Sequence, residues 1–115
     1  MANTFKVITK AGVTSADVIY TVAGSTTTVI LGLMLGNTTS GSSNATVTLG
    51  TDTANRAGAN NEANQDVELL TTTAIPGNTT LEVLSGNKVV METTDTLSVT
   101  GSAALDVVLS VMEIT

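Results

Sequence analysis

Residues 105–114 read LDVVLSVMEI, a stretch that decides the fold because it is apolar on both of its faces. Side chains of an extended strand alternate between two faces, so residues 105, 107, 109 and 111 share one face and residues 108, 112 and 114 share the other. A strand of this kind normally lies in the middle of a sheet and is covered on both sides. We therefore predict a central β-strand, and in a chain this short a partner subunit can supply its second cover.

The rest of the chain repeats this two-residue rhythm in short segments separated by turns. Extended segments are predicted at residues 4–9, 17–23, 27–37, 44–50, 66–73, 79–84, 88–91, 96–100 and 105–114. About eight or nine short strands without a helical period are typical of a β-sandwich or jelly roll. The predicted fold is all-β, a single-domain antiparallel sandwich over residues 1–115 in which residues 1–16 form an N-terminal arm and the first strand.

Two segments carry more specific expectations. Residues 27–37, TTVILGLMLGN, are predicted to place one set of side chains on one face (Val29, Leu31, Leu33 and Leu35) and a second set on the other (Ile30, Gly32, Met34 and Gly36). The two glycines would leave that second face low enough for a neighbouring backbone or large side chain to approach. Residues 51–65 are polar and lack an apolar period, so we predict a long loop there and considered one helical turn near residues 60–64.

The amino-acid composition argues against a catalytic or metal-binding site. The chain has no His, no Cys and no Trp, and its Lys and Arg total 4 of 115 residues. Without His a Ser-His-Asp triad is impossible, and without Cys there is neither a disulfide nor a Cys-ligated zinc. The spacing of the acids matches no calcium loop. We predict no enzymatic activity, no cofactor, no metal and no small-molecule substrate.

Charge and hydropathy restrict the partners. The net charge is −6 and the pI is about 4.1, which speaks against nucleic acid because that ligand needs many Lys and Arg contacts. The longest apolar run, residues 29–35, is far shorter than the roughly 20 residues of a membrane helix, so no membrane partner is expected. No basic and apolar leader begins the sequence, so we expect synthesis in the cytoplasm without secretion. Only 12% of residues are charged, about half the usual share, which favours a surface that packs against other proteins.

Candidate contact residues come from the free ends, the long loop and the last strand. An N-terminal segment and a long loop are the parts best able to reach a neighbour, although both can also be merely mobile. An acid inside the most apolar strand can either pair with a Lys or Arg at an interface or point to water. The predicted protein-interface residues are Phe5, Val7, Arg56, Asn60, Asn61, Asp106, Val108 and Met112. Phe5 and Tyr20 are expected at inward-facing positions, as core or interface anchors.

Several segments of the sequence resemble those of one protein family. They are YTVA at residues 20–23, VILGLMLGN at 29–37, ATVTL at 45–49, IPGNTTL at 75–81, TDTLSVT at 94–100 and DVVLSVMEIT at 106–115. Over residues 17–115 they are similar to small virion structural proteins of tailed bacteriophages, which are frequent in marine phages. The resemblance implies a capsid decoration (cement) protein or a neck or tail component. It also implies an oligomer, often a trimer, and no catalytic residues.

The expected function is therefore structural and its place is the virion. The first hypothesis is a decoration protein that binds and stabilises the head shell as an oligomer, with itself (as a homotrimer) and the major capsid protein as partners. The second is a neck or tail adaptor, or a fibre-base protein, which would contact neck or tail proteins. The third is a carbohydrate-binding β-sandwich for adsorption to the host. It has weak support because sugar sites use exposed aromatic rings and the chain has one Phe and one Tyr.

Overall fold

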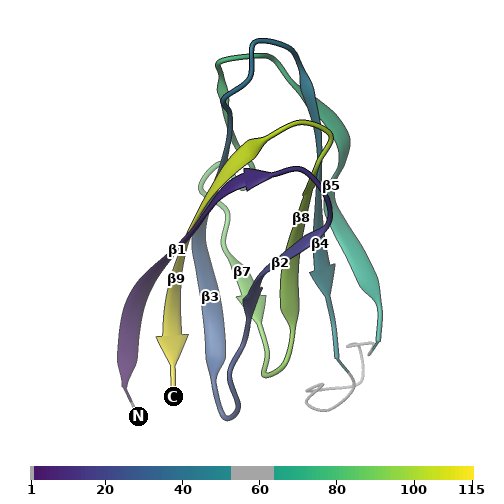
Figure 1. The fold of residues 1–115 in the computed structure, drawn as a ribbon. Coiled ribbons are helices and arrows are strands. Elements are labelled where there is room, and N and C mark those ends of the chain that lie inside the picture. The colour runs from purple at the N-terminus through teal and green to yellow at the C-terminus, as the bar shows by residue number, and fades with distance from the viewer. Residues whose placement is uncertain (1, 53–63) are drawn as a thin grey trace.

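The computed structural model describes residues 2–52 and 64–115, and within them it contains strands and no helix. The strands are β1 (Asn3–Val13), β2 (Asp17–Thr21), β3 (Thr27–Asn37), β4 (Ser43–Gly50), β5 (Asp66–Ile75), β6 (Thr80–Glu82), β7 (Val89–Met91), β8 (Thr96–Gly101) and β9 (Leu105–Ile114). They form two antiparallel sheets that pack against each other (Figure 1). The prediction of an all-β sandwich is confirmed.

Both sheets mix strands from distant parts of the chain. One sheet, which we call the β9 sheet, has the order β1-β9-β3-β6, and β7 also pairs with β3. The other, the β8 sheet, has the order β2-β8-β4-β5. The chain passes from one sheet to the other between β1 and β2 and again between β2 and β3, as in a jelly roll. The N- and C-terminal ends lie side by side (Figure 1), where the backbones of Ala2 and Thr115 exchange two hydrogen bonds.

The core lies between the two sheets, and β9 supplies much of it. Leu105, Val107, Leu109 and Val111 are buried, as their alternation predicted. They pack in one cluster with buried side chains of β3, β4 and β8, which include Ile30, Leu33, Leu35, Val47, Leu97 and Val99. Full burial of one such side chain stabilises the fold by about 1.5–3 kcal/mol relative to exposure. The strand predicted to be central is indeed flanked on both sides, by β1 and by β3.

A β-bulge in β3 overturns the predicted division of its faces. Ile30 pairs with Val111 and Gly32 pairs with Ser110, so Leu31 is an extra residue opposite β9. An extra residue shifts the alternation by one position. The core face of β3 therefore carries Ile30 before the bulge and Leu33 after it. The prediction that Leu31 and Leu33 share a face with Val29 was wrong, because a uniform alternation cannot anticipate a bulge.

Other strand boundaries differ modestly from those predicted. β1 runs to Val13 instead of ending at residue 9, through a register shift between Lys10 and Val13 and a left-handed Gly12 at φ 69°. β6 and β7 are three residues each and shorter than predicted. The loop predicted at residues 51–65 is described only at its ends, where Thr51 donates its N–H to the Gln65 carbonyl. Arg56, Asn60 and Asn61 lie outside the described residues, as does most of the helical turn considered there.

The end of the sandwich farthest from the termini is closed by hydrogen bonds between two loops, which include one from the Asn78 N–H to the Thr39 carbonyl. The side chain of Asn37, 2% exposed, donates to the carbonyls of Gly41 and Ile75 and accepts from the N–H of Thr39. A buried amide whose donors and acceptor are all engaged fixes the geometry of the loops that it joins. Gly77 lies against this assembly, where an added Cβ would come within 2.3 Å of the Ser40 carbonyl oxygen.

Gly101 offers a test of how closely the two sheets approach. A Cβ at this position would lie 2.7 Å from the Val13 carbonyl oxygen and 2.8 Å from that of Ala103, both of which are backbone atoms that cannot swing away. We predict that Gly101→Ala lowers the free energy of unfolding by about 1–3 kcal/mol, the usual cost of overpacking. Urea denaturation checks this. The control is Gly24→Ala, where the added methyl meets nothing within 4 Å; an equal change in both variants would contradict the prediction.

Candidate interaction surface

The outer face of the β9 sheet carries a row of apolar side chains that crosses four strands. The ladders pair Phe5 with Met112, Met112 with Val29, and Val29 with Val90. Paired residues of adjacent strands lie on the same face. Phe5 is 71% exposed and Val90 is 60% exposed, at the two ends of the row. We call this set of four side chains the upper row.

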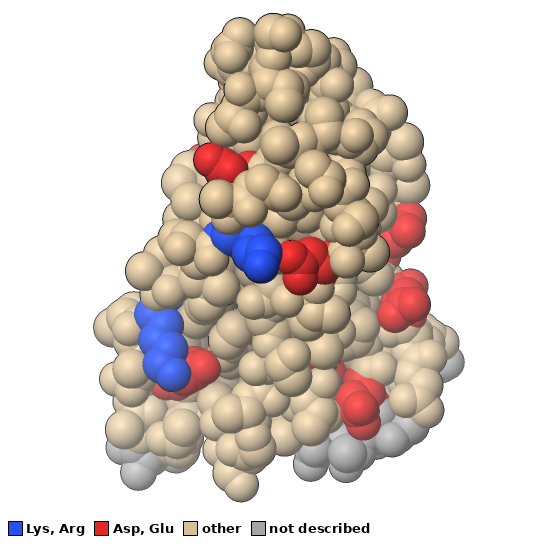
Figure 2. Space-filling model, in the orientation of Figure 1, with Lys and Arg blue, Asp and Glu red and all other residues tan. Residues whose placement is uncertain are grey.

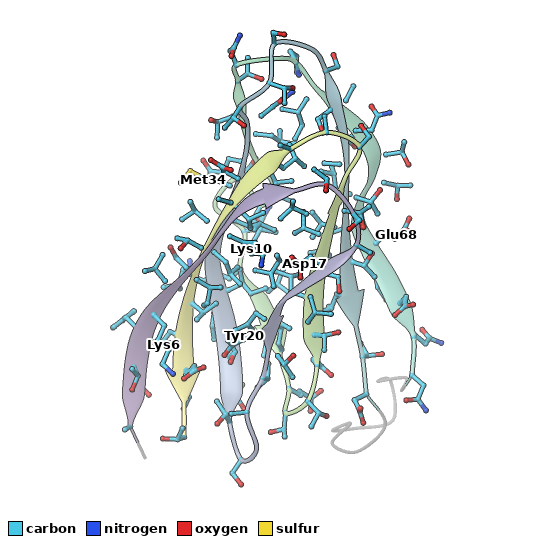
Figure 3. All side chains as sticks on the ribbon, in the orientation of Figure 1. Lys6, Lys10, Asp17, Tyr20, Met34 and Glu68 are labelled. Atoms are coloured by element: carbon cyan, nitrogen blue, oxygen red, sulfur yellow. The ribbon has the colours of Figure 1, made fainter. Side chains whose placement is uncertain are left out.

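The next rows along the same strands differ in how far their side chains project from the sheet. Next to the upper row, Val7 of β1 pairs with Ser110, and Ser110 pairs with Gly32. A Cβ added to Gly32 would meet nothing within 4 Å, so the surface is low there; we call Ser110 and Gly32 the low row. Beyond it, Val108 pairs with Met34, which is 43% exposed. Figure 3 shows Met34 pointing away from the sandwich.

Four of the predicted interface residues meet on this face. Phe5, Val7, Val108 and Met112 come from β1 and β9 and lie on one face with Val29, Met34 and Val90, where Ser110 and Gly32 separate the pair Val108 and Met34 from the upper row. The structure thus brings together half of the predicted set. Val29, Met34 and Val90 were not singled out from the sequence, since the bulge at Leu31 and the pairing of β7 with β3 decide which face they occupy.

Phe5 does not occupy the inward position that was predicted for it. In the register of β1 with β9, Lys6 pairs with the buried Val111 and therefore lies on the inner side, so Phe5 and Val7 face outwards. The reason is electrostatic as well as geometric, because Lys6 Nζ lies 2.8 Å from a Glu113 oxygen. Edge strands commonly carry an inward-pointing Lys, which makes the open edge unfavourable for pairing with other strands.

Asp106 lies at one end of the outer face and serves the fold. Its carboxylate accepts a hydrogen bond of 3.0 Å from the backbone N–H of Gly12, at the irregular part of β1. Among residues 2–52 and 64–115, Asp106 forms no ion pair with a Lys or Arg; a pair with a Lys or Arg of another subunit stays a prediction. The acid instead satisfies a backbone donor that the register shift leaves without a ladder partner.

A polar network that joins the two sheets was not anticipated from the sequence. Tyr20 of β2 donates its hydroxyl hydrogen to Glu113 of β9, and its oxygen lies 2.8 Å from the Thr28 hydroxyl of β3. The same Glu113 pairs with Lys6. Figure 3 shows Lys6 and Tyr20 at the end of the sandwich that holds the termini. One signal was available, since Glu113 occupies an inward position on an otherwise apolar strand, where an acid needs partners.

These contacts move two pKa values apart. Burial, helped by the hydrogen bond to Glu113, raises the pKa of Tyr20 to about 12. Hydrogen bonds from Lys6 and Tyr20 hold the pKa of Glu113 below its ordinary value of 4.5. Because the carboxylate is ionised and the phenol protonated at neutral pH, the network is fixed as a donor–acceptor chain. Its hydrogen bonds and ion pair join strands of the two sheets, so the network stabilises the packing of one sheet on the other.

The second lysine on the side in view is also paired. Lys10 Nζ lies 3.6 Å from a carboxylate oxygen of Asp17. Figure 2 shows each blue patch of this side beside a red one, whereas further red patches have no blue neighbour and most of the surface is uncharged. Among residues 2–52 and 64–115, no group of three or more acidic, His or Cys side chains could hold a metal ion. The same residues contain no helix long and apolar enough to cross a membrane.

The network predicts a specific dependence of stability on pH. Since the pKa of Glu113 is lower in the folded protein than in the unfolded chain, acid protonates the unfolded chain first. The stabilisation by Glu113 is present above about pH 5 and is lost as the pH falls below 4.5 through the folded-state pKa. We predict that Glu113→Gln is less stable than the unaltered protein at pH 7, and that the difference shrinks at pH 3. Denaturation at both pH values measures it, with Glu82→Gln as the control for loss of one acid; a difference independent of pH would contradict the assignment.

Removal of the phenol tests the other half of the network. Tyr20→Phe keeps the ring but leaves Glu113 without its hydroxyl donor, and should lower the free energy of unfolding by about 1.5–3 kcal/mol, as is usual for a hydrogen bond to a charged group. The folded-state pKa of about 12 lies above the unfolded value of 10.0, so the contribution of this tyrosine is full below pH 10 and is lost between pH 10 and 12. A Tyr20→Phe protein that matches the unaltered one in urea at pH 7 would show that the hydrogen bond is immaterial.

Comparisons with known proteins bear on the fold. No protein-family model matches the chain, and no curated protein matches it. A solved structure that resembles it belongs to the Bacillus endospore appendages, described as a novel family of disulfide-linked pili. The two chains share 16% sequence identity at a TM-score of 0.50, and the match covers 97% of this chain and 84% of that one. The likeness is one of fold.

Proposed function

We propose that this protein is a non-enzymatic structural protein of a tailed-phage virion, and that it serves as a decoration protein that stabilises the head shell as an oligomer. The observation that carries the proposal is the apolar outer face of the β9 sheet. Phe5, Val7 and Val90 are each at least 60% exposed there. Contiguous exposed apolar surface on a soluble protein marks a site of contact with another molecule.

The chemistry of the face favours a protein as that molecule. Its side chains come from regular strands, so the surface is broad, shallow and fixed in shape. The residues of the upper row and low row are all uncharged. Such a surface binds by close packing against a complementary protein surface, since it offers neither convergent polar groups for a small ligand nor Lys and Arg for a phosphate.

The sequence resemblance over residues 17–115 supports placing this contact in a virion. The likeness to an endospore pilus protein supports the sandwich and goes no further at 16% identity. The 115 residues contain no cysteine, so the disulfide linkage named for those pili has no counterpart among them.

The two alternative functions would use the outer face of the β9 sheet in different ways. A neck or tail component would use the face equally well and differs from a decoration protein in the number of copies per particle. A carbohydrate-binding protein needs polar groups beside its aromatic ring. Phe5 has apolar neighbours in Val7 and Met112, which favours contact with protein over contact with sugar.

Copy number tests the proposal directly. In purified particles of the phage that encodes the protein, quantitative gel densitometry against the major capsid protein should give hundreds of copies per particle. Tens of copies or fewer would assign the protein to the neck or tail, and its absence from the particles would overturn the virion assignment.

Incorporation should depend on the outer face of the β9 sheet. Val108→Lys places a charge on the outer face between Thr9 and Met34, at a half-exposed position. We predict that this variant folds but is depleted from particles at least tenfold, measured by complementation of a phage that lacks the gene. The control is Thr48→Lys, a half-exposed position on the opposite sheet; equal depletion of both variants, or of neither, would contradict a role for this face.

A further inference from the structure

Most of β1 contributes little to the core of the protein. Every residue from Asn3 to Gly12 is exposed except Ile8, which is half-buried. Val13, at the end of β1, is the one residue of this strand that is buried in the core. β1 lies at the edge of its sheet and pairs with β9 alone (Figure 1). Release of residues 2–10, which we call the β1 arm, would therefore break a backbone ladder and leave most of the core packed.

The β1 arm ends at a break in this ladder. The register shifts between Lys10 and Val13, so Ala11 and Gly12 have no partners in the ladder with β9. Gly12 has a left-handed φ of 69°, and a Cβ added to it would meet nothing within 4 Å. Its N–H donates to the side chain of Asp106 in place of a ladder bond. A short, exposed break with small residues provides a hinge about which a strand can move as a unit.

The edge of β9 that the β1 arm covers is specific for this arm. Eight successive pairs join the two strands, from Asn3 with Ile114 to Lys10 with Val107. At one of their ends, Lys6 Nζ lies 2.8 Å from an oxygen of Glu113. The arm of a second copy of the chain offers the same pairs and the same countercharge. It therefore fits this edge as well as the chain's own arm does.

We propose that copies of this protein exchange their β1 arms, so that residues 2–10 of one copy pair with β9 of a second copy while residues 11–12 extend as the hinge. The inference deepens the proposed function, since it names the contact that joins the copies, and it rests on that function only for the presence of an oligomer. Reciprocal exchange gives a dimer and exchange around a ring gives a trimer, with the same strand pairs in each.

Charge favours this contact over one between unexchanged copies. The chain carries a net charge of −6, so two copies that only touch repel each other. The β1 arm contains Lys6 and Lys10 and no acid, which gives the arm a charge of +2 and the rest of the chain a charge of −8. Exchange thus moves a basic segment onto an acidic second copy, where Lys6 meets Glu113 of that copy.

Exchange also leaves the outer face of the β9 sheet available to another protein. Phe5 and Val7 of the exchanged arm take their places beside Met112 and Ser110 of the second copy, as the same pairs do within one chain. The apolar surface that we propose as the contact with the head shell is then built from two chains. Formation of the oligomer does not cover it.

A disulfide between the β1 arm and β9 tests the exchange, because the chain has no cysteine of its own. Ala2 and Thr115 exchange two backbone hydrogen bonds. Since bonded and non-bonded pairs alternate along an antiparallel ladder, Val7 and Ser110 form a non-hydrogen-bonded pair. The Cα atoms of such a pair are about 4.5 Å apart, within the range that a disulfide spans.

Full-length Val7→Cys/Ser110→Cys, oxidised as an oligomer, should give covalently linked chains of about 23 kDa or more on a denaturing, non-reducing gel, against 11.6 kDa for one chain. The control is Thr48→Cys/Ser98→Cys, a pair on β4 and β8, which should link within one chain. Circular dichroism checks that both variants fold. Links confined to single chains in the arm variant, or a single copy of the unaltered protein at every concentration up to about 1 mM, would overturn the proposal.

A change at the hinge tests the same exchange without cysteines. Valine disfavours the left-handed φ of 69° that Gly12 adopts and favours extended backbone. Gly12→Val should therefore lower the concentration at which half of the chains are oligomeric by about fivefold or more, as measured by light scattering on dilution. The control is Gly24→Val, where φ is not positive and an added Cβ meets nothing within 4 Å. Equal behaviour of the two variants would contradict the hinge.

The outcomes separate the inference from the proposed function. A protein that is abundant in virions, but whose arm variant links only within single chains, contradicts the exchange and leaves the structural role intact. An arm-exchanged oligomer that is absent from purified particles contradicts the virion assignment alone.

Discussion

Strand β9 is held by two antiparallel ladders, to β1 on one side and to β3 on the other, and most of the molecule is arranged around them. The ladders fix the register, and the register fixes which side chains enter the core. Four apolar residues of β9 are fully enclosed on the inner face. A slip of one residue would turn all of them to the opposite face, which is why a strand with a large buried face has only one acceptable pairing.

The same constraint determines the outer face. Because the two faces of a strand alternate, burial of residues 105, 107, 109 and 111 leaves residues 108 and 112 outside. The register then brings Phe5 and Val29 beside Met112 in a single row. The apolar surface that we propose as a protein contact is thus built by the ladders that build the core, and its rigidity follows from theirs.

The polar side chains in the sandwich sit where the apolar packing ends. Glu113 continues the inward alternation of β9 as an acid, and Tyr20 reaches it from the opposite sheet. Lys6 supplies the countercharge and at the same time turns Phe5 outwards. At the other end, the amide of Asn37 joins the carbonyls of Gly41 and Ile75. A buried polar group is tolerated when its partners are all present, and it then favours one arrangement of the elements that supply them.

The sequence by itself determined the fold class and the central position of residues 105–114. Those conclusions rest on the two-residue period, a local property of a strand that holds in any register. The sequence also predicted Phe5, Val7, Val108 and Met112 as contact residues, and the structure places these four side chains on one outer face. Only the tertiary structure decided the direction of Phe5, the bulge at Leu31 and the clamp between Tyr20 and Glu113. Each depends on which residue of a distant strand lies opposite. The alternation of side chains within one strand does not determine which strands pair or in what register. The packing of the two sheets determines both.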